Sequence, residues 1–211
     1  MKFLSITLLA LFFYTYILAD EAFYHKSYNV SELYSEALQY IDKKDYDKAI
    51  EKLEICSSTT RCAHKLAEIY GSDNEKYKDI NKSAYYYNIL FDLGNDKAYH
   101  NLGLLYYKNK DIENAKKYFK KSGDAKVYES FFNLGKLYEL EGDEKESLNN
   151  YLLASEHNVS QADYTLGVYY YNHKDLKKSL YFFNKASKQG FKQANKALES
   201  LNARWENGVR H

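Results

Sequence analysis

The feature that most constrains the fold of this chain is a sequence motif that recurs at a constant interval. Leu-Gly pairs recur at Gly103, Gly135 and Gly167, and similar residues follow each glycine at the same offsets. A tyrosine follows after three residues, an aspartate after eight, a small residue after twelve and an aromatic after sixteen. The tyrosines are Tyr106, Tyr138 and Tyr170, and the small residues are Ala115, Ser147 and Ser179. Self-similarity at a fixed period of roughly 20 to 50 residues is the signature of a repeat architecture.

Two earlier copies carry alanine in the glycine place, at Ala37 and Ala67. In the second of them the aspartate, small residue and aromatic arrive four residues late, as Asp79, Ser83 and Tyr87. The second copy is therefore longer than the regular ones, and the first is slightly shorter. We predict five units near residues 31–60, 61–96, 97–127, 128–160 and 161–192, followed by a capping helix over 193–204. Together they form a repeat domain over 31–201.

Each unit is predicted to be a helical hairpin. Apolar residues fall at helical spacing in two stretches, with polar residues between them. The aspartate can cap the second helix, and Gly94, Gly123, Gly190 and Asn158 are expected to end second helices in a left-handed conformation. The sequence has no proline, a residue that helix interiors exclude. A hairpin buries its apolar face only by stacking on neighbours, so we predict an all-α, right-handed α-solenoid.

Two stretches carry a family resemblance. Residues 99–107, with Ala115 and Phe119, resemble a tetratricopeptide repeat, although the proline that usually ends such a unit is absent. Residues 185–190, continuing to Ala194, look like the hairpin end of a Sel-one-like repeat. The resemblance covers roughly residues 31 to 201. It implies a scaffold that binds a protein or peptide partner, a fold that has been adapted to many functions.

The N-terminus has the layout of a secretory signal peptide. Lys2 precedes an uncharged stretch of sixteen residues, Phe3 to Leu18, and we expect cleavage after Ala19. An uncleaved anchor is the alternative, but sixteen helical residues span only about 24 Å of a hydrocarbon core about 30 Å thick. We therefore expect no stable membrane insertion, a lead-in over 20–30 and a polar tail over 205–211. The chain would be periplasmic or secreted, with a bacterial source favoured, or in the secretory pathway of a eukaryote.

Two cysteines, Cys56 and Cys62, flank the turn between the first two units. In an exported chain an even pair predicts a disulfide; the alternative is two small buried residues. The pair resembles the corner disulfides of secreted cysteine-rich Sel-one-like proteins, which usually have wider spacing. That resemblance raises an alternative function as a cell-wall or β-lactam-interacting protein. A eukaryotic secretory-pathway adaptor is a third reading, which glycosylation at Asn81 or Asn158 would favour.

Other kinds of chemistry find little support. The net charge of +1 argues against a nucleic-acid partner. We find no catalytic motif and no cofactor motif, and therefore expect no enzyme activity and no cofactor. The cysteine pair and His64 supply too few ligands for a metal site. His64 and His100 hold nearly equivalent positions on first helices, where they would either line one groove or lie solvated on the helix surface.

A partner would lie on the concave surface formed by the first helices. Counting from each glycine, the positions three before, one after and four after are expected to face it. These give Tyr34, Leu38, His64, His100, Leu104, Tyr107, Phe132, Lys136, Tyr164, Val168 and Tyr171, with Ile41, Glu68 and Glu139 at the same offsets. An aromatic and aliphatic groove suits an extended or helical peptide with apolar anchors. The alternative is that several aromatics pack between hairpins, Tyr107 and Tyr171 above all.

Overall fold

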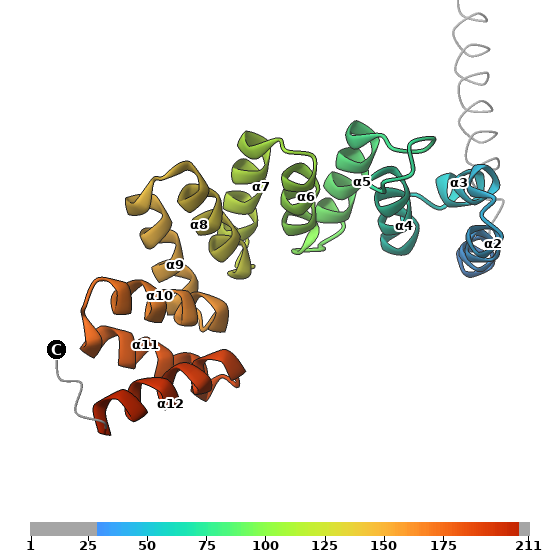
Figure 1. The fold of residues 1–211 in the computed structure, drawn as a ribbon. Helices are drawn as coiled ribbons and strands as arrows, with labels where there is room; N and C mark the ends of the chain where they lie inside the picture. The colour runs from blue at the N-terminus through green and yellow to red at the C-terminus, as the bar shows by residue number, and fades with distance from the viewer. Residues whose placement is uncertain (1–28, 207–211) are drawn as a thin grey trace, which may run out of the picture. The chain divides into compact units, whose positions relative to one another are not determined.

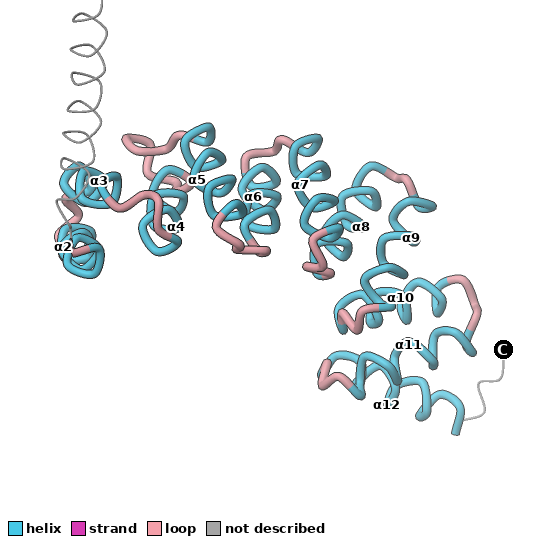
Figure 2. The backbone as a smooth tube through the Cα atoms, turned by 180° about the vertical axis from the view of Figure 1, so that it is seen from behind, coloured by secondary structure: helices cyan, strands magenta, loops and turns pink. Residues whose placement is uncertain are grey.

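The computed structural model describes residues 29–206, which form eleven helices and connecting turns without a strand (Figures 1 and 2). In chain order they are α2 (Val30–Asp42), α3 (Tyr46–Ile55), α4 (Thr60–Tyr70), α5 (Ile80–Asp92), α6 (Ala98–Lys108), α7 (Ile112–Asp124), α8 (Glu129–Glu141), α9 (Glu144–Glu156), α10 (Ser160–Asn172), α11 (Leu176–Lys188) and α12 (Lys192–Glu206). They fall into two compact units that divide between Leu66 and Ala67. The predicted signal peptide and most of the lead-in and polar tail lie outside the described residues.

Helices adjacent in sequence pack against each other within each unit. In the first unit α2 packs on α3, and in the second unit every helix from α5 to α12 packs on the next (Figure 1). The connection from α4 to α5 is held by the Ser83 hydroxyl, which donates to the Ala67 carbonyl at 2.8 Å. The prediction of an all-α repeat solenoid is confirmed.

The repeated aspartates cap the second helices, as predicted. Each side chain accepts a hydrogen bond from the backbone N–H three residues further on, which satisfies a donor that has no partner inside the helix. These residues are Asp45, Asp79, Asp111, Asp143 and Asp175. The periodic aspartate is therefore the signal that marks where each second helix begins.

The prediction for the ends of the second helices is right at Gly94, Asn158 and Gly190, which have positive φ angles of 82°, 61° and 82°. It is wrong at Gly123, which lies inside α7, while the left-handed residue is Lys126 with φ of 68°. Gly123 is instead explained by close packing against a neighbouring helix. A Cβ atom there would lie 2.6 Å from Phe131 Cε1 of α8, so any larger residue would collide with the ring.

The core of each regular hairpin is a contact between a glycine of the first helix and an aromatic ring of the second. A Cβ atom on Gly103, Gly135 or Gly167 would come within 2.6, 2.7 or 2.5 Å of Phe119, Tyr151 or Phe183. All six residues are buried. In the first hairpin the corresponding residues are Ala37 and Leu53, both fully buried. Compared with the regular hairpins, the first hairpin thus has a larger residue on its first helix, alanine for glycine, and a smaller one on its second helix, leucine for an aromatic ring.

We expect Gly167→Ala to destabilise the protein, although alanine in a helix interior normally stabilises by about 1 kcal/mol relative to glycine. The added methyl group would meet Phe183 Cδ1 at 2.5 Å, and overpacking of this kind typically costs about 1–3 kcal/mol. Urea unfolding followed by circular dichroism measures the change in unfolding free energy.

The matched control is the double variant Gly167→Ala, Phe183→Leu, which copies the alanine and leucine of the first hairpin. It should recover part of the loss of the single alanine variant, so that the two changes are favourably coupled. Additive effects of the two substitutions would contradict the size-matching account.

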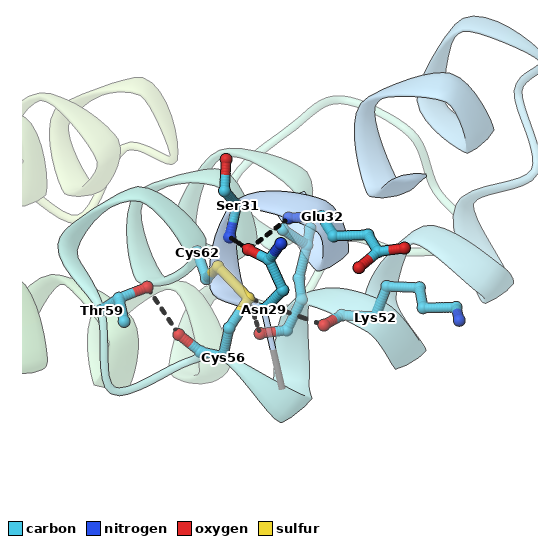
Figure 3. Close-up of a disulfide and its surroundings, with 8 residues drawn as sticks. Asn29, Ser31, Glu32, Lys52, Cys56, Thr59 and Cys62 are labelled. Carbon is cyan, nitrogen blue, oxygen red and sulfur yellow. Dashed lines mark hydrogen bonds between the residues drawn. A yellow bond between two sulfur atoms is a disulfide. The ribbon is translucent and has the colours of Figure 1, made fainter. Parts of the chain in front are cut away.

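A disulfide joins the end of α3 to the start of α4. The structure pairs Cys56 with Cys62, and both residues are buried (Figure 3). The turn between them is also held by Thr59, whose hydroxyl donates to the Cys56 carbonyl at 2.8 Å (Figure 3). This corner is thus held by both a covalent bond and a hydrogen bond.

Replacing both cysteines, as Cys56→Ala with Cys62→Ala, should lower the unfolding free energy by about 2 kcal/mol. Without the disulfide the unfolded chain regains the conformational entropy that closing this short loop removed. Urea unfolding with and without a reducing agent measures it. Reduction should affect the native chain and leave the alanine variant unchanged. Equal midpoints for the oxidised and reduced native chain would show that the bond does not stabilise the fold.

Candidate binding surfaces

The first-helix surface is exposed at some of the predicted positions and filled at others. In the first unit Tyr34, Leu38, Ile41 and His64 are all half-buried. In the second unit Leu104, Tyr107 and Lys136 are exposed, together with Glu68 and Glu139. His100, Phe132, Tyr164, Val168 and Tyr171 are half-buried. The exposed residues of α6 and α8 are therefore the part of the prediction that can contact a partner directly.

An open pocket of about 290 Å³ lies between α4 and α6. It combines Leu104 and Glu68, both predicted groove residues, with Lys108 and the small residues Ala67 and Gly71. Tyr87, Asn101 and Leu105 complete the lining. Lys108 forms an ion pair with Asp73, with 2.7 Å between Nζ and Oδ2. The pocket is therefore lined mainly by apolar and small residues, with one acidic and one basic residue among them.

Three half-buried groove candidates also pack against buried clusters. Phe132 packs against Tyr151, with ring centroids 5.6 Å apart, and touches two buried clusters. Tyr164 and Val168 pack against the cluster that contains Phe183. Tyr107, for which packing between hairpins was the alternative, is 42% exposed. The offset from the glycine cannot separate these cases, because it does not record which neighbouring side chain covers the position.

His100 is half-buried, and its ring contacts two neighbouring helices. Its Nδ1 lies 2.7 Å from the Ser130 hydroxyl, which itself donates to Ser122 at 2.8 Å. The ring also packs edge-on against Phe119, with centroids 5.8 Å apart. Three helices, α6, α7 and α8, thus meet at this histidine. Burial lowers the pKa of the His100 imidazole below its usual value near 6.5, with Lys97 acting in the same direction and Glu129 opposing it.

The stabilising contribution of neutral His100 should therefore decline as the pH falls below about 6.5. The folded pKa is below the unfolded one, so the unfolded chain binds the proton first as the pH drops. The histidine's contribution is fully present above the unfolded pKa and is lost as the pH falls toward the folded pKa. His100→Gln, which keeps a polar group near Ser130, should flatten this part of the stability profile between pH 7.5 and 5.

Urea unfolding across that pH range gives the profile, and His157→Gln is the control because His157 is exposed. An unchanged slope in His100→Gln, or an equal flattening in the control, would contradict the assignment.

A buried polar network that the sequence analysis missed joins α9, α10 and α11. Asp163 is fully buried and accepts hydrogen bonds from the Ser155 hydroxyl and, at 2.6 Å, from the Gln189 amide. Lys185 Nζ lies 3.2 Å from the same carboxylate and also donates to the Ser155 carbonyl. Asp163 occupies the repeat position of Tyr99 and Phe131. The signal in the sequence was therefore an acid where the two preceding units have an aromatic residue.

The described residues contain no group of three or more histidine, cysteine, aspartate or glutamate side chains arranged to hold a metal ion. Among the helices of residues 29–206, none combines the length and the apolar character needed to cross a bilayer.

Comparisons with known proteins agree with the repeat architecture. The family model of the tetratricopeptide repeat matches residues 96–122. A Sel1 repeat protein from Oxalobacter formigenes superposes with a TM-score of 0.59 at 19% identity, over 90% of this chain and 86% of that one. The MamA protein gives 0.53 at 16% identity, over 79% and 94% of the two chains.

A protective antigen present in uropathogenic Escherichia coli strains, which displays an SLR fold, gives a TM-score of 0.55 at 19% identity, over 83% of this chain and 42% of the antigen. No curated protein matches the sequence significantly. Identities this low establish the fold alone. The predicted resemblance is confirmed: the chain carries a tetratricopeptide repeat and has the fold of tetratricopeptide and Sel1-like repeat proteins.

Proposed function

We propose that this protein is an exported repeat scaffold that binds a peptide segment of a protein partner on its first-helix surface and catalyses no reaction. The observation that carries the proposal is the exposure of Leu104 and Tyr107 on α6, 41% and 42%. Leu104 also lines the pocket between α4 and α6. Exposing two large apolar residues to water is unfavourable. A partner that covered them would gain about 25 cal/mol for each Å² of apolar surface removed from water.

Charged residues near α6 add to the recognition. Glu68 and Lys108 both line the pocket, so a bound segment would meet one acidic side chain and a lysine that is already paired with Asp73. In the next repeat the places of Leu104 and Tyr107 are taken by Lys136 and Glu139, both exposed. A matching segment would therefore place apolar anchors over α6 and polar or charged residues over α8.

Two further observations support the remaining parts of the proposal. The predicted signal peptide and the Cys56–Cys62 disulfide both suit an oxidising, exported environment. Repeat proteins of the tetratricopeptide and Sel1-like type generally serve as scaffolds rather than catalysts, which supports a binding role.

The test is a capture experiment with residues 20–211 as bait on solubilised envelope from the source organism, using light crosslinking and mass spectrometry. The double variant Leu104→Glu, Tyr107→Glu places two charges on the apolar surface and should lose a specific partner by at least about tenfold. It should stay folded, because both residues are already about 40% exposed.

The matched control is Leu140→Glu, which changes an apolar residue that is 70% exposed and lies outside the pocket. It should leave capture intact. Equal capture by the native chain and the α6 variant would rule out this surface, and turnover of a reporter β-lactam by the purified chain would replace the scaffold proposal with the cell-wall alternative.

A further inference from the structure

Stacked rings join the two helices in three of the four repeats of the second unit. In each, a tyrosine near the end of the first helix lies parallel to an aromatic ring of the second helix. The pairs are Tyr70 with Tyr86 at 5.9 Å and 2°, Tyr106 with Tyr118 at 5.3 Å and 5°, and Tyr170 with Phe182 at 5.5 Å and 4°. Offset stacking of this kind adds to the gain from burial alone.

The remaining repeat, formed by α8 and α9, lacks the second ring. Its tyrosine is Tyr138 on α8, but the position midway in sequence between Tyr118 and Phe182, one repeat from each, is Asn150 on α9. The Asn150 side chain turns back on its own helix, where Nδ2 donates to the Glu146 carbonyl at 2.8 Å. It therefore cannot replace the missing ring as a stacking partner.

An open cleft of about 620 Å³ lies at this place. Tyr138 and Asn150 both line it, with Phe131, Leu134, Leu152 and Leu153 as the apolar part of its wall. Its volume is in the range of ligand pockets, about 300–1,000 Å³. The cleft shares no residue with the pocket between α4 and α6. It is therefore a separate surface from the one proposed above.

The same repeat also has an acid at the second-helix position where two other repeats carry a lysine. Lys82 lies 4.8 Å above the Tyr70 ring and Lys178 lies 4.8 Å above the Tyr170 ring, whereas the matching residue of the α8–α9 repeat is Glu146. The cleft is lined by Glu146, Glu156, Asn149 and Lys120, and Lys120 has Asp124 at 3.9 Å.

Lys116 of α7 does reach the Tyr138 ring, at 5.4 Å, but two carboxylates already neutralise it. Its Nζ lies 2.8 Å from both Glu113 and Glu141. The surroundings of the cleft are therefore acidic and amide-bearing.

We propose that this cleft binds a peptide segment of a protein partner that presents an aromatic side chain next to an arginine or lysine. The segment would supply from outside the ring and the cation that other repeats carry in their own second helix. The ring would stack on Tyr138 against Leu134, and the cation would pair with Glu146. Asn149 offers an exposed amide that can both donate to and accept from the peptide backbone.

The test is a titration of ¹⁵N-labelled residues 20–211 with the acetylated, amidated peptide Gly-Ser-Phe-Arg-Ser-Gly, followed by NMR. Saturable shifts should concentrate on amides of α8 and α9. Asn150→Phe, which copies Phe182, should fill the cleft, raise the melting temperature and weaken binding by at least about tenfold. Asn150→Ala is the matched control: it leaves the cleft open and should bind within about twofold of the native chain.

Two peptides and one further variant test the chemistry. Replacing the peptide's phenylalanine with alanine, or its arginine with glutamate, should each weaken binding several-fold. Glu146→Lys should weaken the arginine peptide and also covers the case in which Asn150→Phe fails to fold. The double variant Leu104→Glu, Tyr107→Glu should bind this peptide normally, which separates this cleft from the α6 surface.

The proposal is overturned if millimolar peptide gives no saturable shifts, or if Asn150→Phe binds as the native chain does. It is also overturned if the shifts map to α6, or if the glutamate peptide binds as tightly as the arginine peptide.

Discussion

The close contact between the two helices of each hairpin is the constraint on which the rest of the structure depends. A glycine on the first helix faces a ring on the second in the three regular repeats, at Gly103, Gly135 and Gly167, and no Cβ atom would fit between them. This contact sets how near the helices approach. The aspartate cap then fixes where the second helix starts, and the neighbouring hairpins bury what remains of the apolar faces.

Most of the fold could be predicted because this constraint recurs in the sequence. The constant interval, the glycine, the aspartate and the aromatic each have a local physical role that reads directly from residue type. Gly123 shows the limit of that reasoning. A glycine near a helix end has two explanations, a left-handed end or a close neighbour, and only the position of Phe131 decides between them.

The candidate site was harder to predict, because exposure depends on contacts between repeats rather than on the offset within one. Leu104 and Phe132 are both at predicted groove positions, yet one is exposed and the other packs on Tyr151. The informative signals are departures from the repeat. Asp163 replaces an aromatic and organises a buried polar network, and Asn150 replaces a ring and leaves a cleft. Because the repeat is regular, a position that departs from it can be recognised in the sequence. Such departures mark the places where the packing of one repeat differs from that of the others.

The central claim is that such packing contacts, and not the repeat offset alone, decide which side chains a partner can reach. Hydroxyl-radical footprinting of the purified chain, read out by mass spectrometry, tests this most directly. The account predicts rapid oxidation of Tyr107 and Leu104 and slow oxidation of Phe132, although the repeat offset assigns all three to one groove. Equal oxidation rates for Tyr107 and Phe132 would contradict it.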